Sequence, residues 1–108
     1  MSFNVVVTDF FEHELKALAK RHRSLKNDLA VLVAELESNP LIGTDIGSHC
    51  RKIRLAITSK GKGKSGGARV ITHIQVAGNT VYMISIYDKS DMENIDDAIL
   101  KKRLKNLS

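Results

Sequence analysis

The chain has no acidic residue over a long central stretch. No aspartate or glutamate occurs from Ile46 to Tyr87, although the 108 residues include 12 acidic ones. The same stretch holds seven of the 17 basic residues, so its charge is +7. The remainder of the chain has a charge of −2, which gives the net charge of +5. Those seven are Arg51, Lys52, Arg54, Lys60, Lys62, Lys64 and Arg69. Because such a segment attracts polyanions, we expect it to hold a nucleic-acid backbone.

Cysteine is equally scarce. Cys50 is the only one, which excludes a disulfide framework and a cysteine-rich zinc site. The four histidines are scattered without metal-ligand spacing, so we expect no metal and no cofactor. His49 precedes Cys50, but neighbours in a strand point to opposite faces, and a thiol nucleophile is therefore not favoured. We expect a small, buried cysteine instead.

Signals for export and for membrane insertion are missing as well. The N-terminal segment has no charged region ahead of its apolar residues, and acidic residues begin at Asp9. Apolar runs are too short to span a bilayer. A lone thiol fits a reducing compartment. These features predict a cytoplasmic protein without a membrane anchor.

The first half of the chain has one strand pattern and two helix patterns. Residues 3–7 are apolar and β-branched, which is typical of a strand. Asp9 and Glu12 have the spacing of a capping box that would begin a helix. A second helix would begin at Ser24 and end before Pro40. Its apolar face is formed by Leu25, Leu29, Leu32 and Leu36.

The second half predicts a meander of three strands and a last helix. Residues 41–50 are expected to form a loop. Strands are expected from residue 52 to 57, from 69 to 76 and from 81 to 87, and the glycine-rich residues 59–67 would be a flexible connector. Ser90 and Glu93 would cap a helix with Ile95, Ile99 or Leu100, Leu104 and Leu107 on its buried side.

Together these patterns predict a single α+β domain over residues 1–108 with the order β-α-α-β-β-β-α. We expect a helical hairpin and a C-terminal helix to pack around a small, mainly antiparallel sheet.

A basic constellation lies on the predicted meander. Lys52 and Arg54 share one strand face, and Arg69 begins the next strand. If Tyr82, Ile84 and Ile86 face the helices, then Tyr87 lies on the side of Lys52 and Arg54, and Lys89 follows that strand. Cations can orient RNA for attack by its own 2′-hydroxyl and stabilise the developing charge. Arginine grips phosphate oxygens bidentately, and a lysine with a lowered pKa can act as a base. The alternative is that these residues only bind phosphates.

The sequence also resembles a known family. The runs CRKIRLAITSKGKGKSGGARVITHI and VYMISIYDKSDM, in the predicted element order, are similar to the RelE/ParE superfamily of toxins from bacterial toxin–antitoxin modules, and most of all to its RelE/HigB branch. The resemblance implies a RelE-like fold and a ribosome-dependent endoribonuclease that cuts messenger RNA. It also implies a cognate antitoxin, which we expect to be of the helix-turn-helix type.

The resemblance assigns roles to individual residues. Lys52 and Arg54 match the base and charge stabiliser of RelE-type enzymes, and Arg69 matches the arginine that holds the scissile phosphate. Lys89 occupies the place of a further arginine. RelE has a tyrosine in its C-terminal helix where this chain is near Ile95, and Tyr87 would substitute for it. Expected contacts to messenger or ribosomal RNA backbone come from Arg51, Lys60, Lys62 and Lys64.

Two other functions stay open at this point. A ParE-like toxin would share the fold but poison DNA gyrase, because a fold alone does not determine function. A non-catalytic RNA-binding module would show tight, salt-dependent binding without cleavage.

Overall fold

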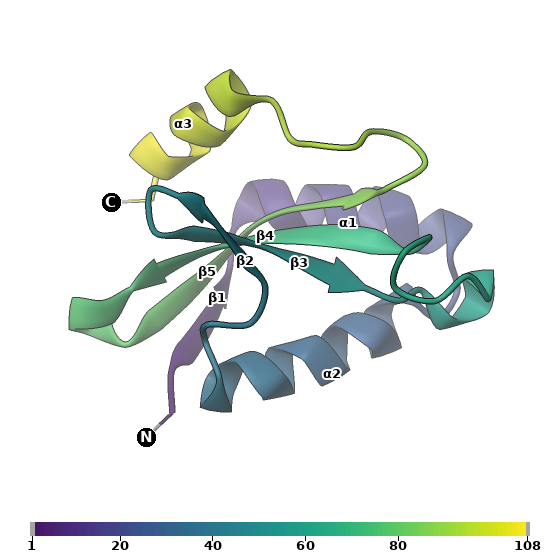
Figure 1. Ribbon diagram of the computed structural model, residues 1–108, viewed down its shortest axis with the longest axis horizontal. Coiled ribbons are helices and arrows are strands. Elements are labelled where there is room, and N and C mark those ends of the chain that lie inside the picture. The colour runs from purple at the N-terminus through teal and green to yellow at the C-terminus, as the bar shows by residue number, and fades with distance from the viewer. Residues whose placement is uncertain (1, 108) are drawn as a thin grey trace.

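A computed structural model of the chain describes residues 2–107 (Figure 1). The elements in chain order are β1 (Asn4–Val7), α1 (Asp9–Arg21), α2 (Leu25–Ser38), β2 (Thr44–Gly47), β3 (Cys50–Leu55), a 3-10 turn (Thr58–Lys60), β4 (Ala68–Gln75), a second 3-10 turn (Val76–Gly78), β5 (Thr80–Asp88) and α3 (Asp97–Lys105). The α+β class and the predicted order are confirmed, with β2 as one additional strand. None of the helices of residues 2–107 is long and apolar enough to cross a membrane.

The strands form one sheet in the order β1-β5-β4-β3-β2. β1 lies parallel to β5, and the other neighbours are antiparallel. The prediction of a loop over residues 41–50 was wrong in part, because strand β2 within it pairs with β3. All four residues of β2 are exposed, so the strand carries no apolar alternation from which it could be recognised.

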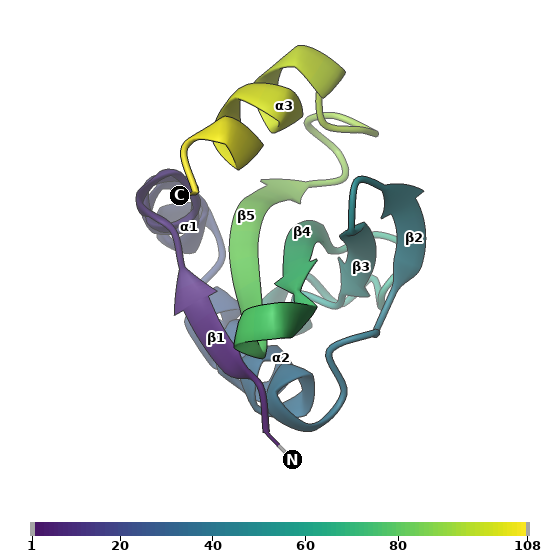
Figure 2. The same cartoon turned by 90° about the vertical axis from the view of Figure 1, so that its left-hand side faces the viewer.

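The sheet separates two apolar clusters. α1 and α2 lie on one side and α3 on the other (Figures 1 and 2). The leucine repeat of α2 is buried against the first face together with Phe11, Ile53, Val70 and Ile86. Leu100 of α3 packs on the second face with Cys50, Ile71, Ile84 and Tyr87. The predicted buried side of α3 therefore includes Leu100 and not Ile99, which is exposed.

A β-bulge changes the facing of β5. Ile71 pairs with Ser85 whereas Thr72 pairs with Met83, so Ile84 is an extra residue in the strand. Past this point the alternation of side chains shifts. Ile86 faces α1 and α2 as predicted, but Ile84 and Tyr82 belong to the cluster on the α3 side. The condition that Tyr82, Ile84 and Ile86 share one face therefore does not hold, because residue parity does not reveal a bulge.

The helix caps also differ from the predicted ones. The hydroxyl of Thr8 accepts a hydrogen bond from the Phe11 amide at 3.3 Å and donates to the Met83 carbonyl at 2.6 Å, so Thr8 and not Asp9 caps α1. Asp96 caps α3 by accepting from the amides of Ala98 and Ile99. The capping box expected at Ser90 and Glu93 was therefore wrong.

Ser24 occupies the position before α2 but does not cap it with its side chain. Its hydroxyl donates to Asp28 at 2.8 Å instead and lies 2.9 Å from the Ser59 hydroxyl.

Candidate nucleic-acid interface

The central strands bring three of the predicted site residues into one row. Arg54 on β3 is opposite Arg69 on β4, which is opposite Tyr87 on β5. Directly opposed residues share one face of a sheet, with Cβ atoms about 5 Å apart. The prediction that Tyr87 lies on the side of Lys52 and Arg54 is therefore confirmed. Lys52 lies one row further along, opposite Ile71.

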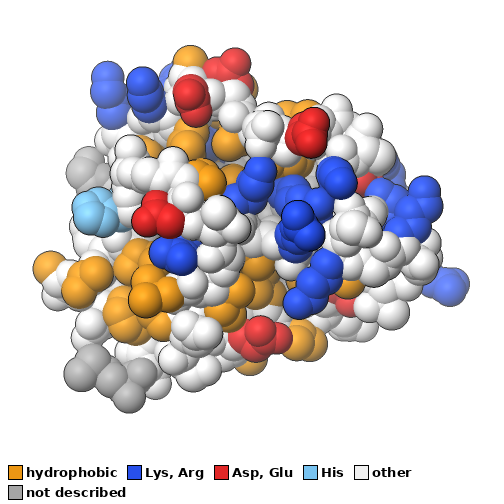
Figure 3. Space-filling model, in the orientation of Figure 1, with side chains coloured by type: hydrophobic (Ala, Val, Ile, Leu, Met, Phe, Trp, Pro, Cys, Tyr) orange, Lys and Arg blue, Asp and Glu red, His pale blue; other side chains and the backbone are white. Residues whose placement is uncertain are grey.

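Figure 3 shows Lys and Arg side chains gathered over the end of β3 and the loop that follows it. We call residues 58–67 the lysine loop. It leads from β3 to β4 and carries three lysines of the acid-free stretch.

Arg69 has an unexpected environment. Its side chain is buried, with 4% of the residue exposed. The guanidinium donates to the carbonyls of Lys64 at 2.9 Å, Ser65 at 3.2 Å and Ala68 at 3.0 Å. Arg69 therefore shapes the end of the lysine loop, and its role in holding the scissile phosphate stays a prediction.

Tyr87 is buried to a similar extent, with 5% exposed. Its hydroxyl donates to the carbonyl of Glu93 at 3.3 Å. Burial raises the pKa of the Tyr87 hydroxyl, and the positive charge of Arg69 opposes that shift only in part. The group is therefore protonated at neutral pH and can donate a proton or a hydrogen bond.

The chain between β5 and α3 passes over the same face. Lys52 Nζ donates to Asn94 Oδ1 at 2.7 Å across a hollow of about 410 Å³. The hollow lies between the sheet and α3, where Ile46, Ile71 and Leu100 also line it. Arg54 is exposed, so it remains accessible to a polyanion while Lys52 is partly covered.

The predicted RNA-binding residues fall into two groups. Lys62 and Lys64 are exposed, as an RNA contact requires, and Lys89 of the predicted catalytic set is exposed as well. Arg51 is on the opposite face from Lys52, and its guanidinium donates to the Gly43 carbonyl at 3.0 Å. We call the side of the sheet that carries Lys52, Arg54, Arg69 and Tyr87 the basic face, and the structure does not bring Arg51 to it.

Lys60 differs from the other two lysines of the loop. Only 16% of its side chain is exposed, and Nζ lies 2.7 Å from Asp88 Oδ1. The expectation of a flexible connector is wrong at this end of the loop. Residues 58–60 form a 3-10 turn, and Asp28 accepts hydrogen bonds from the Thr58 amide and hydroxyl.

Sequence reasoning missed Asp88 altogether. Its carboxylate is 1% exposed and accepts hydrogen bonds from Lys60, from the Ser90 amide and hydroxyl, and from His22 at 2.9 Å. Burial alone would raise the pKa of Asp88, but these bonds, with Lys60 foremost, hold it well below its usual range. The only signal in the sequence is that Asp88 is the first acid after the basic stretch.

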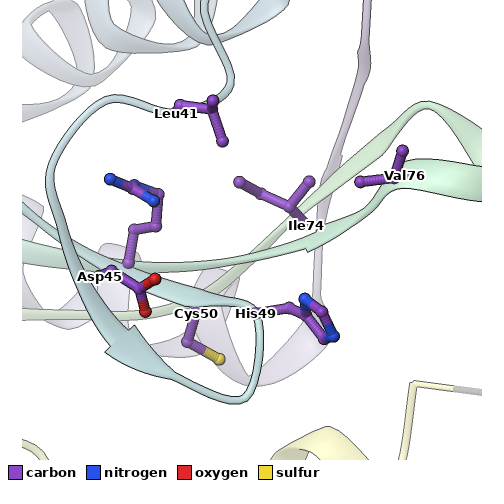
Figure 4. A pocket seen from close by; sticks show the side chains of 7 residues that line it. Leu41, Asp45, His49, Cys50, Ile74 and Val76 are labelled. Carbon is purple, nitrogen blue, oxygen red and sulfur yellow. The ribbon is translucent and has the colours of Figure 1, made fainter.

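Cys50 begins β3 beneath a hollow lined by Leu41, His49 and Ile74 (Figure 4). Its sulfur points away from Leu41 and Ile74 and lies 3.6 Å from His73 Nδ1. Burial raises the pKa of the Cys50 thiol to about 11, with a smaller contribution from Asp45. Burial also lowers the pKa of His73, so the pair is neutral and supplies no thiolate.

Alkylation tests this assignment of Cys50. At pH 8 iodoacetamide should modify the folded protein roughly 100-fold more slowly than the urea-unfolded chain, because the thiolate fraction falls tenfold for each unit by which the pKa is raised. Mass spectrometry of a time course measures both rates. Equal rates would show that Cys50 is accessible and ionised.

Among residues 2–107 no three histidine, cysteine, aspartate or glutamate side chains are grouped so that they could hold a metal ion. The charged side chains of the row, Arg54 and Arg69, are cations, and Asp97 lines the hollow next to Lys52.

The sequence and the fold are similar to those of known proteins. The model of the family described as the RelE toxin of the RelE/RelB toxin–antitoxin system matches residues 9–108. The chain is similar to E. coli toxin RelE, solved in the free state as a double arginine-to-alanine mutant, with 17% identity, a TM-score of 0.63 and full coverage of both chains. The toxin–antitoxin complex RelBE2 from Mycobacterium tuberculosis includes a similar chain, with 17% identity and a TM-score of 0.62 over 82% of this chain and 99% of that one. At such identities the structures support the fold, and the family match extends over most of the sequence. The chain therefore belongs to the RelE toxin family.

Proposed function

We propose that this toxin cleaves messenger RNA on the ribosome. The observation that carries the proposal is the row formed by Arg54, Arg69 and Tyr87, with Lys52 beside it. Two cations and a protonated phenol on one face suit a phosphodiester that gains negative charge as it reacts. The resemblance to the HigB branch stays a prediction.

In the proposed reaction the 2′-oxygen attacks the adjacent phosphorus and the bond to the 5′-oxygen breaks. Lys52 in its neutral form accepts the proton of the 2′-hydroxyl, and Tyr87 donates a proton to the departing 5′-oxygen. Arg54 stabilises the charge on the non-bridging oxygens, and Arg69 supports it from within the sheet. The products are a 2′,3′-cyclic phosphate and a 5′-hydroxyl.

These cations supply the charge stabilisation that a metal ion provides in other nucleases, so we propose that cleavage is independent of metal ions. The ribosome would hold the messenger, and the toxin would act in the cytoplasm. A cognate antitoxin of the helix-turn-helix type would neutralise it by crossing the basic face with acidic residues.

The test is induction of the toxin without antitoxin, followed by mapping of transcript ends. We expect growth arrest with new cuts at fixed codon positions. Purified protein should cleave messenger RNA on programmed ribosomes with no divalent metal other than the magnesium that keeps the ribosome assembled. Growth arrest with intact transcripts would contradict the proposal. If the purified protein inhibits DNA supercoiling by gyrase, that result would instead favour the ParE-like function.

A further inference from the structure

We propose that Lys60 and Asp88 form a positioning pair that holds the lysine loop against the end of β5 and does not bind RNA. The inference rests on the proposed function, since it concerns the placement of the loop beside the reacting phosphate. Asp88 directly follows Tyr87 and is opposite Ala68 in the sheet, so the pair lies next to the row of site residues.

The carboxylate of Asp88 connects three parts of the chain. Oδ1 accepts from Lys60 at 2.7 Å and from the Ser90 hydroxyl at 2.7 Å. Oδ2 lies 2.9 Å from His22 Nε2 and 3.6 Å from the guanidinium of Arg21. The end of α1, the lysine loop and the turn after β5 therefore meet at one buried negative charge.

The loop is also fastened on either side of this pair. On its first side Asp28 accepts from Thr58, and the Ser59 amide donates to the Ser24 hydroxyl at 2.8 Å. On its second side Arg69 binds the carbonyls of Lys64 and Ser65. The Lys89 amide donates to the Gly67 carbonyl at 3.1 Å, which ties the loop to the residue after β5.

Between these attachments lies the tip of the loop. Gly61 and Gly63 have φ angles of 71° and 64°, a backbone conformation that favours glycine, and they flank the exposed Lys62. The three lysines therefore divide by environment. Lys62 and Lys64 present their charge to solvent, whereas the charge of Lys60 is opposed by Asp88.

This division has a consequence for binding. A lysine that neutralises a phosphate releases counterions and contributes to the salt dependence of binding. A lysine already paired with a buried carboxylate contributes no such release. The function of Lys60 is then to fix where Arg69 and the loop carbonyls lie, and misplacement by about 1 Å can cost roughly 100-fold in rate.

Four variants separate positioning from phosphate binding: Lys60→Met, Lys60→Arg, the charge-balanced double variant Lys60→Met with Asp88→Asn, and Lys62→Met as the matched control. Each is assayed for single-turnover cleavage at saturating ribosome concentration and for the salt dependence of binding to a single-stranded RNA. Amide hydrogen exchange over the loop is measured at a temperature where each variant is folded.

The double variant should cleave about 30- to 100-fold more slowly, exchange its loop amides faster and keep the parent's salt slope. Lys62→Met should keep the parent's exchange of the loop amides, and its salt slope should fall by about 0.7. Lys60→Arg keeps a cation opposite Asp88 and should retain most of the parent's cleavage rate, unlike Lys60→Met.

A double variant that loses the same salt slope as Lys62→Met, with unchanged loop exchange, would overturn the proposal and make Lys60 a phosphate contact. Should the parent protein not cleave RNA, the proposed function fails, while loop exchange and the salt slope still decide the role of the pair.

Discussion

Arg69→Ala is expected to lower messenger-RNA cleavage by at least about 100-fold, because it removes both a cation of the site and the support of the loop. Three carbonyls lose their guanidinium partner, two of them in the lysine loop. The free energy of unfolding should fall by about 1–3 kcal/mol, which leaves the domain folded. Single-turnover cleavage and thermal unfolding measure the two effects.

Arg69→Lys sharpens the interpretation. An ammonium group keeps the charge but lacks the planar fork that reaches the Lys64 and Ser65 carbonyls together. We therefore expect the Arg69→Lys variant to have less than a tenth of the parent's cleavage rate. Arg23→Ala removes an exposed arginine that lies outside the basic face and serves as the control with unchanged cleavage. Full activity of Arg69→Lys would show that charge alone is needed at this position.

Tyr87→Phe should reduce the rate of cleavage by about 100-fold at saturation while leaving the affinity for RNA unchanged. The ring keeps its packing against Leu100 and Ile71, and only the hydroxyl that donates to Glu93 is lost. The cost in unfolding free energy should therefore be about 1 kcal/mol.

Tyr82→Phe provides a matched control, because Tyr82 also lies on the α3 side of β5 and its hydroxyl is 3.5 Å from Gln75 Oε1, away from the site. Its cleavage rate should equal that of the parent. If Tyr87→Phe also cleaves at the parent rate, the hydroxyl takes no part in the reaction and another group must protonate the leaving oxygen.

Much of the fold could be predicted because it depends on periodic apolar residues. The leucines of α2 are buried at the positions that helical spacing assigns to them. Ile53 and Lys52 lie on opposite faces of β3 as the alternation requires. The side on which Tyr87 lies was also predicted, although the bulge at Ile84 invalidated part of the reasoning that led there.

The remaining features depend on contacts between residues far apart in the chain. Lys60 and Asp88 are 28 positions apart, and no local pattern joins them. Arg69 was expected to grip phosphate, yet its buried guanidinium is bonded to backbone carbonyls that any sequence would provide. A charge count treats all lysines of the loop alike, whereas burial distinguishes them.

The position of β5 in the sheet bears on the synthesis of the toxin. β5 is paired on both sides, with β1 from the start of the chain and with β4, and Thr8 is bonded to Met83 across 75 positions. A growing chain that has not yet reached β5 can form neither the pairings of β5 with β1 and β4 nor the row that ends at Tyr87. Native structure of this kind, made of contacts between distant segments, forms late. A partly made chain therefore lacks the row of site residues on which the proposed cleavage of messenger RNA depends.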